Sequence, residues 1–163
     1  MIKIDSEEAY TAAVTEFSDM IYRIAYQNML NIADAEDVVQ EVLFKLLKHR
    51  GAFADREHIK AWLIRVTVNQ CKDIHKILFR RKEVSIEDIE EFDAASDESD
   101  DYVFLELSKL PKEDRNVIYL YYYEGYSIRE IAEILKKNQN TVNARLTRAR
   151  RKLEKILLED DYL

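Results

Sequence analysis

Glycine, proline and cysteine are scarce in this chain of 163 residues, which holds 2 Gly, 1 Pro and 1 Cys. Hairpin turns depend on Gly, Asn-Gly or Asp-Gly, so their scarcity argues against a protein built on antiparallel sheet. The single cysteine, Cys71, excludes an internal disulfide and makes the reducing cytoplasm the expected compartment. No apolar run approaches the roughly 18 residues of a membrane span, and the first ten residues lack the apolar core of a signal peptide.

Motifs of catalysis and cofactor binding are also missing. The chain has no Gly-rich phosphate loop, no Ser-His-Asp order and no Cys-x-x-Cys pair. Cys71 and His75 share one helical face, but a structural metal site needs four ligands and no second pair follows. We therefore expect no enzyme, no metal and no cofactor.

Helix-forming residues are abundant, since the chain is 47% hydrophobic and 35% charged, with long segments of Leu, Ile, Ala, Glu, Lys and Arg. This composition predicts an all-α fold. The expected helices cover residues 7–29, 35–48, 58–80, 111–124, 128–135 and 139–158. Asp34 and Asn138 are the expected N-caps of the second and last of these helices, and Gly125 is expected to end the fourth.

Charge is distributed unevenly along the chain. Residues 82–102, called the acidic segment below, hold ten acids and one base, a charge of −9, so the remainder carries −7 + 9 = +2. This composition predicts a linker between two small helical domains, residues 1–81 and residues 103–163. Basic stretches in both domains point to a nucleic-acid partner despite the net negative charge.

The second domain has the plan of a helix-turn-helix. Ser127 and Glu130 form an S-x-x-E capping box before a short helix, and a tight turn leads to a longer basic helix. In that last helix an apolar stripe predicts the core face, and the opposite arc mixes amide, methyl and guanidinium groups that suit base edges in a major groove. The stripe is Val142, Leu146, Ala149, Leu153 and Ile156, and the opposite arc is Asn140, Ala144, Thr147, Arg148 and Arg151. A solvated basic face on an ordinary helix is the alternative.

The third helix of the first domain carries a basic stripe beside aromatic residues. The stripe is Arg65, Asn69, Lys72 and Lys76, and the aromatic residues are Trp62 and Phe53. Basic groups for the backbone and aromatic rings for stacking suit an opened single strand. The alternative is that both aromatic residues belong to the core.

The second helix is amphipathic, with an apolar stripe opposite a polar face. The stripe is Val38, Val39, Val42, Leu43, Leu46 and Leu47, and the polar face is Glu36, Asp37, Gln40, Glu41 and Lys45. That polar face is either solvated or a docking surface for a partner helix, and periodicity alone does not decide between them.

Three segments together resemble the extracytoplasmic-function (ECF) sigma factors of bacterial RNA polymerase. Residues 34–42 resemble the core-binding segment, where A-E-D-x-x-Q-E opens a helix. Trp62-Leu63-Ile64-Arg65-Val66, followed by Asn69 and Asp73, resembles the W-L-x-R-I…N…D helix that engages the downstream promoter box. Residues 110–150, from Leu-Pro to R-L-T-R-A-R, resemble the domain for the upstream box.

The resemblance implies an initiation factor with no catalysis of its own. Its partners would be the clamp helices of the polymerase's largest subunit, duplex promoter DNA, the non-template strand and an anti-sigma factor, with no membrane insertion. Upstream-box contacts are expected from Asn140, Thr141, Asn143, Ala144, Arg145, Thr147, Arg148 and Arg151. Downstream contacts are expected from Phe53, Trp62, Arg65, Asn69, Lys72 and Lys76, and polymerase contacts from Asp37, Gln40 and Glu41.

The chain departs from the family pattern at the upstream-box helix. Asn143 and Ala144 stand where the family often has Lys and Ser, which removes a positive charge and a hydrogen-bond donor and predicts an unusual base preference. Two other functions fit the sequence. A stand-alone helix-turn-helix regulator would bind operator DNA without polymerase, and a helical adaptor would bind an acidic protein instead of DNA.

Overall fold

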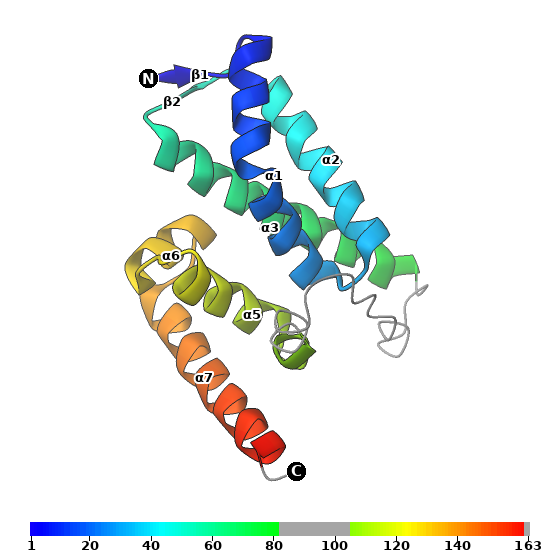
Figure 1. Ribbon diagram of the computed structural model, residues 1–163, viewed down its shortest axis with the longest axis vertical. Helices are drawn as coiled ribbons and strands as arrows, with labels where there is room; N and C mark the ends of the chain where they lie inside the picture. Colours follow the sequence, from blue (N-terminus) through cyan, green and yellow to red (C-terminus); the bar gives the residue numbers. More distant parts are fainter. Residues whose placement is uncertain (82–104, 162–163) are drawn as a thin grey trace. The chain divides into compact units, whose positions relative to one another are not determined.

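The computed structural model describes residues 1–81 and 105–161 and divides the chain into two compact units, residues 1–93 and 94–163. Nearly all described residues outside turns are helical, which confirms the all-α prediction (Figure 1). The predicted acidic segment lies outside the described residues.

In residues 1–81, the described part of unit 1, three helices pack against one another (Figure 1). Helix α1 covers Glu7–Met29, as predicted. It begins after Ser6, whose side chain accepts a hydrogen bond from the Ala9 amide at 3.1 Å, and ends at Leu30, where φ is 54°. Its buried stripe, which includes Phe17 and Ile21, faces the other two helices.

Helix α2 covers Ile32–Lys48 and starts one turn earlier than predicted. The expected N-cap, Asp34, is wrong: the cap is Asn31, whose Oδ1 accepts a hydrogen bond from the Asp34 amide at 2.9 Å. Asp34 lies in the first turn instead, where its negative charge is favourable at the positive end of the helix dipole.

Helix α3 covers Arg56–Arg81 and completes the core of unit 1. The Asp55 carboxylate accepts a hydrogen bond from the His58 amide at 2.9 Å, so the helix starts slightly before the predicted residue 58. Two strands, β1 (Ile2–Lys3) and β2 (Ala52–Phe53), pair antiparallel beside it and were not predicted. Each strand has only two residues, too short for a recognisable alternation of apolar and polar residues.

Unit 2 begins its described part with residues 105–110 and then helix α5, Lys112–Ile118, which has Pro111 at its N-cap. The predicted α-helix to residue 124 changes instead into a π-helical turn, η2, Tyr119–Tyr123. Its wider backbone bond runs from the Glu124 amide to the Tyr119 carbonyl at 3.2 Å. Gly125 follows with a φ of 77°, which confirms it as the residue that ends this helix.

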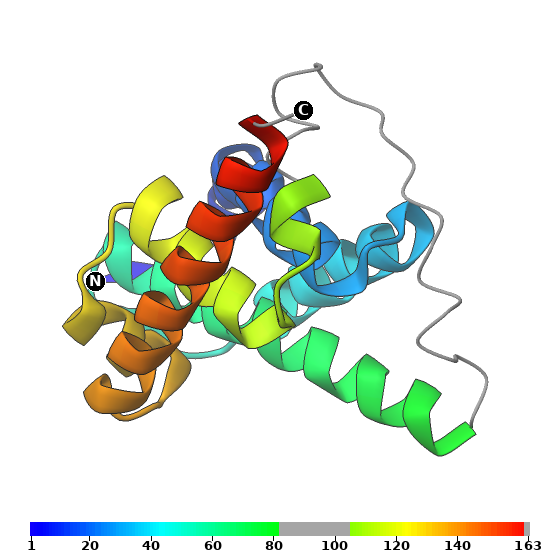
Figure 2. The same ribbon diagram turned by 90° about the horizontal axis from the view of Figure 1, so that it is seen from below.

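The helix-turn-helix consists of α6 (Ile128–Leu135) and α7 (Gln139–Asp161) (Figure 2). Both hydrogen bonds of the predicted capping box are present, each at 3.1 Å, between Ser127 and Glu130. The turn is made by Lys136 with a φ of 54°, and Asn138 accepts a hydrogen bond from the Asn140 amide at 2.7 Å. The predicted local plan of this motif is therefore confirmed.

Candidate nucleic-acid interface

The buried stripe of α7 fixes which side of that helix faces solvent. Val142, Leu146 and Ala149 are fully buried against α5 and α6. The opposite arc is therefore outward, and most of its predicted contact residues lie at the surface. Asn140, Thr141, Asn143, Ala144, Arg148 and Arg151 are exposed, and Arg145 and Thr147 are half-buried.

Arg148, one of the predicted base-contacting residues of α7, forms an ion pair within unit 2. Its Nη2 and Nε atoms donate hydrogen bonds to the two carboxylate oxygens of Asp114 in α5, at 2.8 and 3.1 Å. The Asp114 side chain is completely buried, whereas 54% of the Arg148 side chain is exposed. This hydrogen bond and the charge of Asp114 raise the pKa of Arg148 above its ordinary value. Sequence analysis did not anticipate this pair.

A second arginine of α7 is engaged by the π-helical turn. The Arg150 Nε donates a hydrogen bond to the Tyr122 hydroxyl at 2.5 Å, and its guanidinium lies 5.1 and 5.3 Å from the Tyr121 and Tyr122 ring centres. The contacts with the two rings are cation–π interactions. They hold the Arg150 side chain against the π-helical turn, at the side of α7. Lys136 and Lys137, on the turn before α7, are exposed at the other end of the motif.

In unit 1 the aromatic pair next to α3 divides into one core residue and one partly exposed residue. Phe53 is 1% exposed and packs between His49, His58 and Trp62, with ring centres 4.6, 5.3 and 5.6 Å away. Its ring has no free face on which a base can stack, so its predicted strand contact is replaced by a supporting position beneath Trp62. Trp62 itself is half-buried.

The predicted basic stripe of α3 reaches the surface along its length. Asn69 and Lys76 are exposed, and Arg65 and Lys72 are half-buried. Leu63, Ile64 and the other buried residues of α3 lie on the opposite side and anchor the helix to α1 and α2.

The outer face of α2 is acidic at its start and apolar at its end. Asp37, Gln40 and Glu41 are exposed, as is Glu36. Leu47, predicted to lie in the core stripe, is 53% exposed, and Phe44 is 46% exposed with the Lys48 ammonium 4.3 Å from its ring centre. The core placement of Leu47 was wrong: the buried residues Val38, Val42 and Leu46 form one line along α2, and Leu47 lies about 100° around the helix from Leu46. Sequence analysis also missed Phe44, although a phenylalanine on a polar face is a recognisable signal.

Comparison with known proteins identifies this arrangement of helices. The Sigma-70 region 2 family matches residues 13–83, and the Sigma-70 region 4 family matches residues 102–153. The chain is 30% identical to the RNA polymerase sigma factor SigV of Bacillus subtilis, over 91% of this chain and 90% of the relative. It belongs to the ECF sigma factors.

Two further similarities agree with this assignment. This sigma factor is 29% identical to the ECF RNA polymerase sigma factor SigW of Bacillus subtilis, over 96% of the chain and 92% of the relative. Its fold is similar to that of the sigma factor RpoE from Bartonella quintana, solved in complex with the anti-sigma factor NepR. That similarity has a TM-score of 0.66 at 22% identity and covers 91% of this chain and 96% of the other.

Membership establishes the general function of the chain. The chain is an RNA polymerase-binding factor that directs promoter-specific initiation of transcription, and the regulator and adaptor alternatives are not favoured. None of the helices in residues 1–81 and 105–161 is both long and apolar enough to cross a bilayer.

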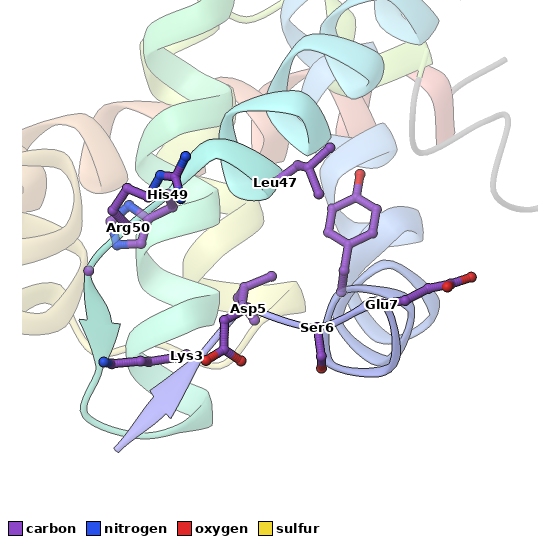
Figure 3. A pocket seen from close by; sticks show the side chains of 10 residues that line it. Lys3, Asp5, Ser6, Glu7, Leu47, His49 and Arg50 are labelled. Atoms are coloured by element: carbon purple, nitrogen blue, oxygen red, sulfur yellow. The ribbon is translucent and has the colours of Figure 1, made fainter.

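The sigma factor also has a hollow of about 580 Å³ in unit 1, between β1, the start of α1 and the end of α2 (Figure 3). Its lining mixes both charges, with the cations of Lys3 and Arg50 and the carboxylates of Asp5 and Glu7. Leu47 of α2 also lines it, whereas Asp37, Gln40 and Glu41 do not.

Proposed function

We propose that this sigma factor contacts the upstream promoter box through α7, the downstream strand through α3 and the polymerase core through α2. The observation that carries the proposal is the exposure of all three predicted faces on helices whose opposite sides are buried. A solvated basic face, the alternative for α7, does not explain why that helix follows a capped helix and a three-residue turn.

Helix α7 is suited to the major groove of duplex DNA. Its first three turns present short polar and methyl-bearing side chains: Asn140, Thr141, Asn143, Ala144 and Thr147. Short side chains allow the helix to approach base edges closely. Lys136 and Lys137 before the helix, and Arg151 further along it, lie where contacts with phosphates would position it.

Helix α3 is suited to a separated strand. Trp62 offers a partly exposed ring whose position is fixed by the buried Phe53, and Asn69 and Lys76 follow along the same helix. A ring for stacking and cations for the phosphate backbone are the two components of single-strand binding. We assign these residues, with Arg65 and Lys72, to the non-template strand of the downstream box.

Helix α2 is suited to a partner helix. Asp37, Gln40 and Glu41 provide acceptors, and the exposed Phe44 and Leu47 extend the same surface with apolar area. An amphipathic helix of this kind docks by apolar anchors surrounded by charged pairs. We assign the surface to the clamp helices of the polymerase's largest subunit.

In this proposal the sigma factor performs no catalysis, and the polymerase forms all phosphodiester bonds. The protein acts in the cytoplasm, where it meets polymerase. The solved complex of a sigma factor of similar fold with an anti-sigma factor supports a partner of that kind for this chain as well.

Run-off transcription tests the proposal. Fragmented bacterial DNA is transcribed by core polymerase with and without the full chain, and the 5′ ends of the transcripts are mapped. We expect discrete new start sites that appear only with the protein and share two upstream sequence boxes. Specific duplex binding without new start sites would overturn the proposal in favour of a stand-alone regulator.

A further inference from the structure

The first two turns of α7 carry amide side chains on their exposed arc, and the nearest exposed arginine is held by another residue. Asn140 and Asn143 are exposed, and Arg148 is bound to Asp114. From this arrangement we infer that Asn143 selects an adenine in the upstream box. The inference rests on the proposed function, because it names the base that α7 recognises there.

The position of Asn143 follows from the buried side of the helix. Asn143 follows the fully buried Val142 and shares an outward arc with Asn140 and Thr147, three residues before it and four residues after it. Ala144, with its single methyl group, follows it at the surface, and neither Asn140 nor Thr147 is longer than Asn143. The Asn143 amide therefore reaches a base edge without a longer side chain in its way.

An asparagine amide matches adenine better than any other base in the major groove. Its oxygen accepts from adenine N6, and its NH₂ group donates to adenine N7. The methyl groups of the neighbouring Ala144 and Thr147 suit the C5-methyl group of thymine on the paired strand. A lysine or arginine at the same position would favour the two acceptors of guanine.

Asp114 holds one edge of the Arg148 guanidinium. Nε and one N–H of Nη2 are directed at Asp114, which leaves the Nη1 N–H groups and the second N–H of Nη2 for other acceptors. Withdrawing this edge would leave a fully buried carboxylate without its ion-pair partner. The contact holds α7 to α5, and through α7 it sets the angle at which Asn143 faces the groove.

The remaining arginines of α7 are not placed for a base contact beside Asn143. Arg150 is held to the flank by Tyr121 and Tyr122, and Arg145 is half-buried next to the core residue Leu146. Arg151 is exposed but lies two turns beyond Ala144, where a helix entering the groove by its first turns meets phosphates.

A selection experiment tests the inference. Holoenzyme made from core polymerase and the full chain transcribes a library with a randomised upstream box, and the transcribed templates are sequenced. The wild type is expected to enrich adenine at the position that Asn143 contacts. In Asn143→Ala this preference falls by about 5- to 100-fold at that position alone. In Asn143→Lys the preferred base changes to guanine.

Two controls separate the roles of the arginines. Arg151→Ala is expected to reduce transcription from all templates equally, without a change in preferred sequence. Arg148→Lys, which keeps a cation for Asp114, is expected to leave the adenine preference at the Asn143 position within about twofold of wild type. Loss of the adenine preference in Arg148→Lys, or an unchanged adenine preference in Asn143→Ala, would overturn the inference. Absence of transcripts with the wild-type chain would overturn the proposed function itself.

Discussion

The guanidinium of Arg148 in α7 is bound to the fully buried carboxylate of Asp114 in α5, which lies 34 residues earlier in the chain. Both carboxylate oxygens accept a hydrogen bond, at 2.8 and 3.1 Å. A buried carboxylate is costly unless it is paired, so this contact ties the recognition helix to the helix that supports it. The orientation of α7 thus depends on a residue outside the helix-turn-helix.

Arg148→Ala is expected to destabilise unit 2. The substitution leaves the Asp114 carboxylate buried without its partner, and we expect the melting temperature to fall by about 5 °C or more. Arg151→Ala is the matched control, because it removes an exposed arginine three residues along the same helix and surface changes of this kind usually cost less than about 0.5 kcal/mol. Thermal unfolding followed by circular dichroism distinguishes the two. Equal melting temperatures for both variants would show that the pair contributes no stability.

Asp37→Lys is expected to prevent binding to core polymerase while the fold is retained. Reversing a charge on the proposed α2 surface places a cation where the partner offers donors, and we expect affinity to fall at least about tenfold. The residue is exposed, so the melting temperature changes little. Asp19→Lys makes the same change on the exposed side of α1 and serves as control. Co-elution with polymerase in gel filtration measures both, and equal retention of the two variants would contradict the docking surface.

Substitutions of Phe53 and of Trp62 are expected to have different effects: the first lowers stability, and the second impairs strand opening. Phe53→Ala empties a buried site and is expected to lower the free energy of unfolding by about 3–5 kcal/mol. Trp62→Ala is expected to cost less, because this ring is half-buried, and to reduce transcription from duplex promoters more than from templates opened in advance. Urea unfolding and transcription from both templates measure these effects. An equal loss on both templates would place Trp62 outside the opening step.

The capping box of α6 predicts a dependence of stability on pH. Hydrogen bonds from the Ser127 backbone and side chain hold the pKa of Glu130 below its ordinary value. A lowered pKa in the folded state means that the ionised carboxylate stabilises the fold. This contribution is complete above the unfolded-state pKa and disappears as the pH falls through the folded-state pKa.

Glu130→Ala is therefore expected to cost about 0.5–1 kcal/mol at pH 7 and nearly nothing once the carboxylate of the wild type is protonated. The control is Glu133→Ala on the same helix, where the exposed pair with Arg129 at 3.5 Å contributes little at either pH. Urea titrations at pH 7 and below pH 4 measure the difference. If Glu130→Ala still lowers the free energy of unfolding by the same amount at low pH, the ionised carboxylate is not the source of the effect.

Several features of the fold follow from the sequence because they are local. The capping box joins Ser127 and Glu130, three residues apart, and the φ of 77° at Gly125 suits glycine whatever surrounds it. The stripe of Val142, Leu146 and Ala149 is periodic, so its burial and the outward face of α7 follow from helix geometry. The α2 cap was misplaced by three residues, because Asn31 and Asp34 are both capable caps and only the backbone distinguishes them.

Only the tertiary structure determined the contacts between residues that are far apart in the chain. No local pattern links Asp114 to Arg148, or marks Phe53 as core beneath a partly exposed Trp62. Packing also determined that Leu47 lies at the surface, since α1 and α3 cover the side of α2 that carries Val38, Val42 and Leu46. The sequence by itself determined the helices and their amphipathic faces, because both arise within a few residues. Which side chains on those faces remain available to a partner depended on packing, because a polar group near the surface pairs with whatever the fold brings beside it.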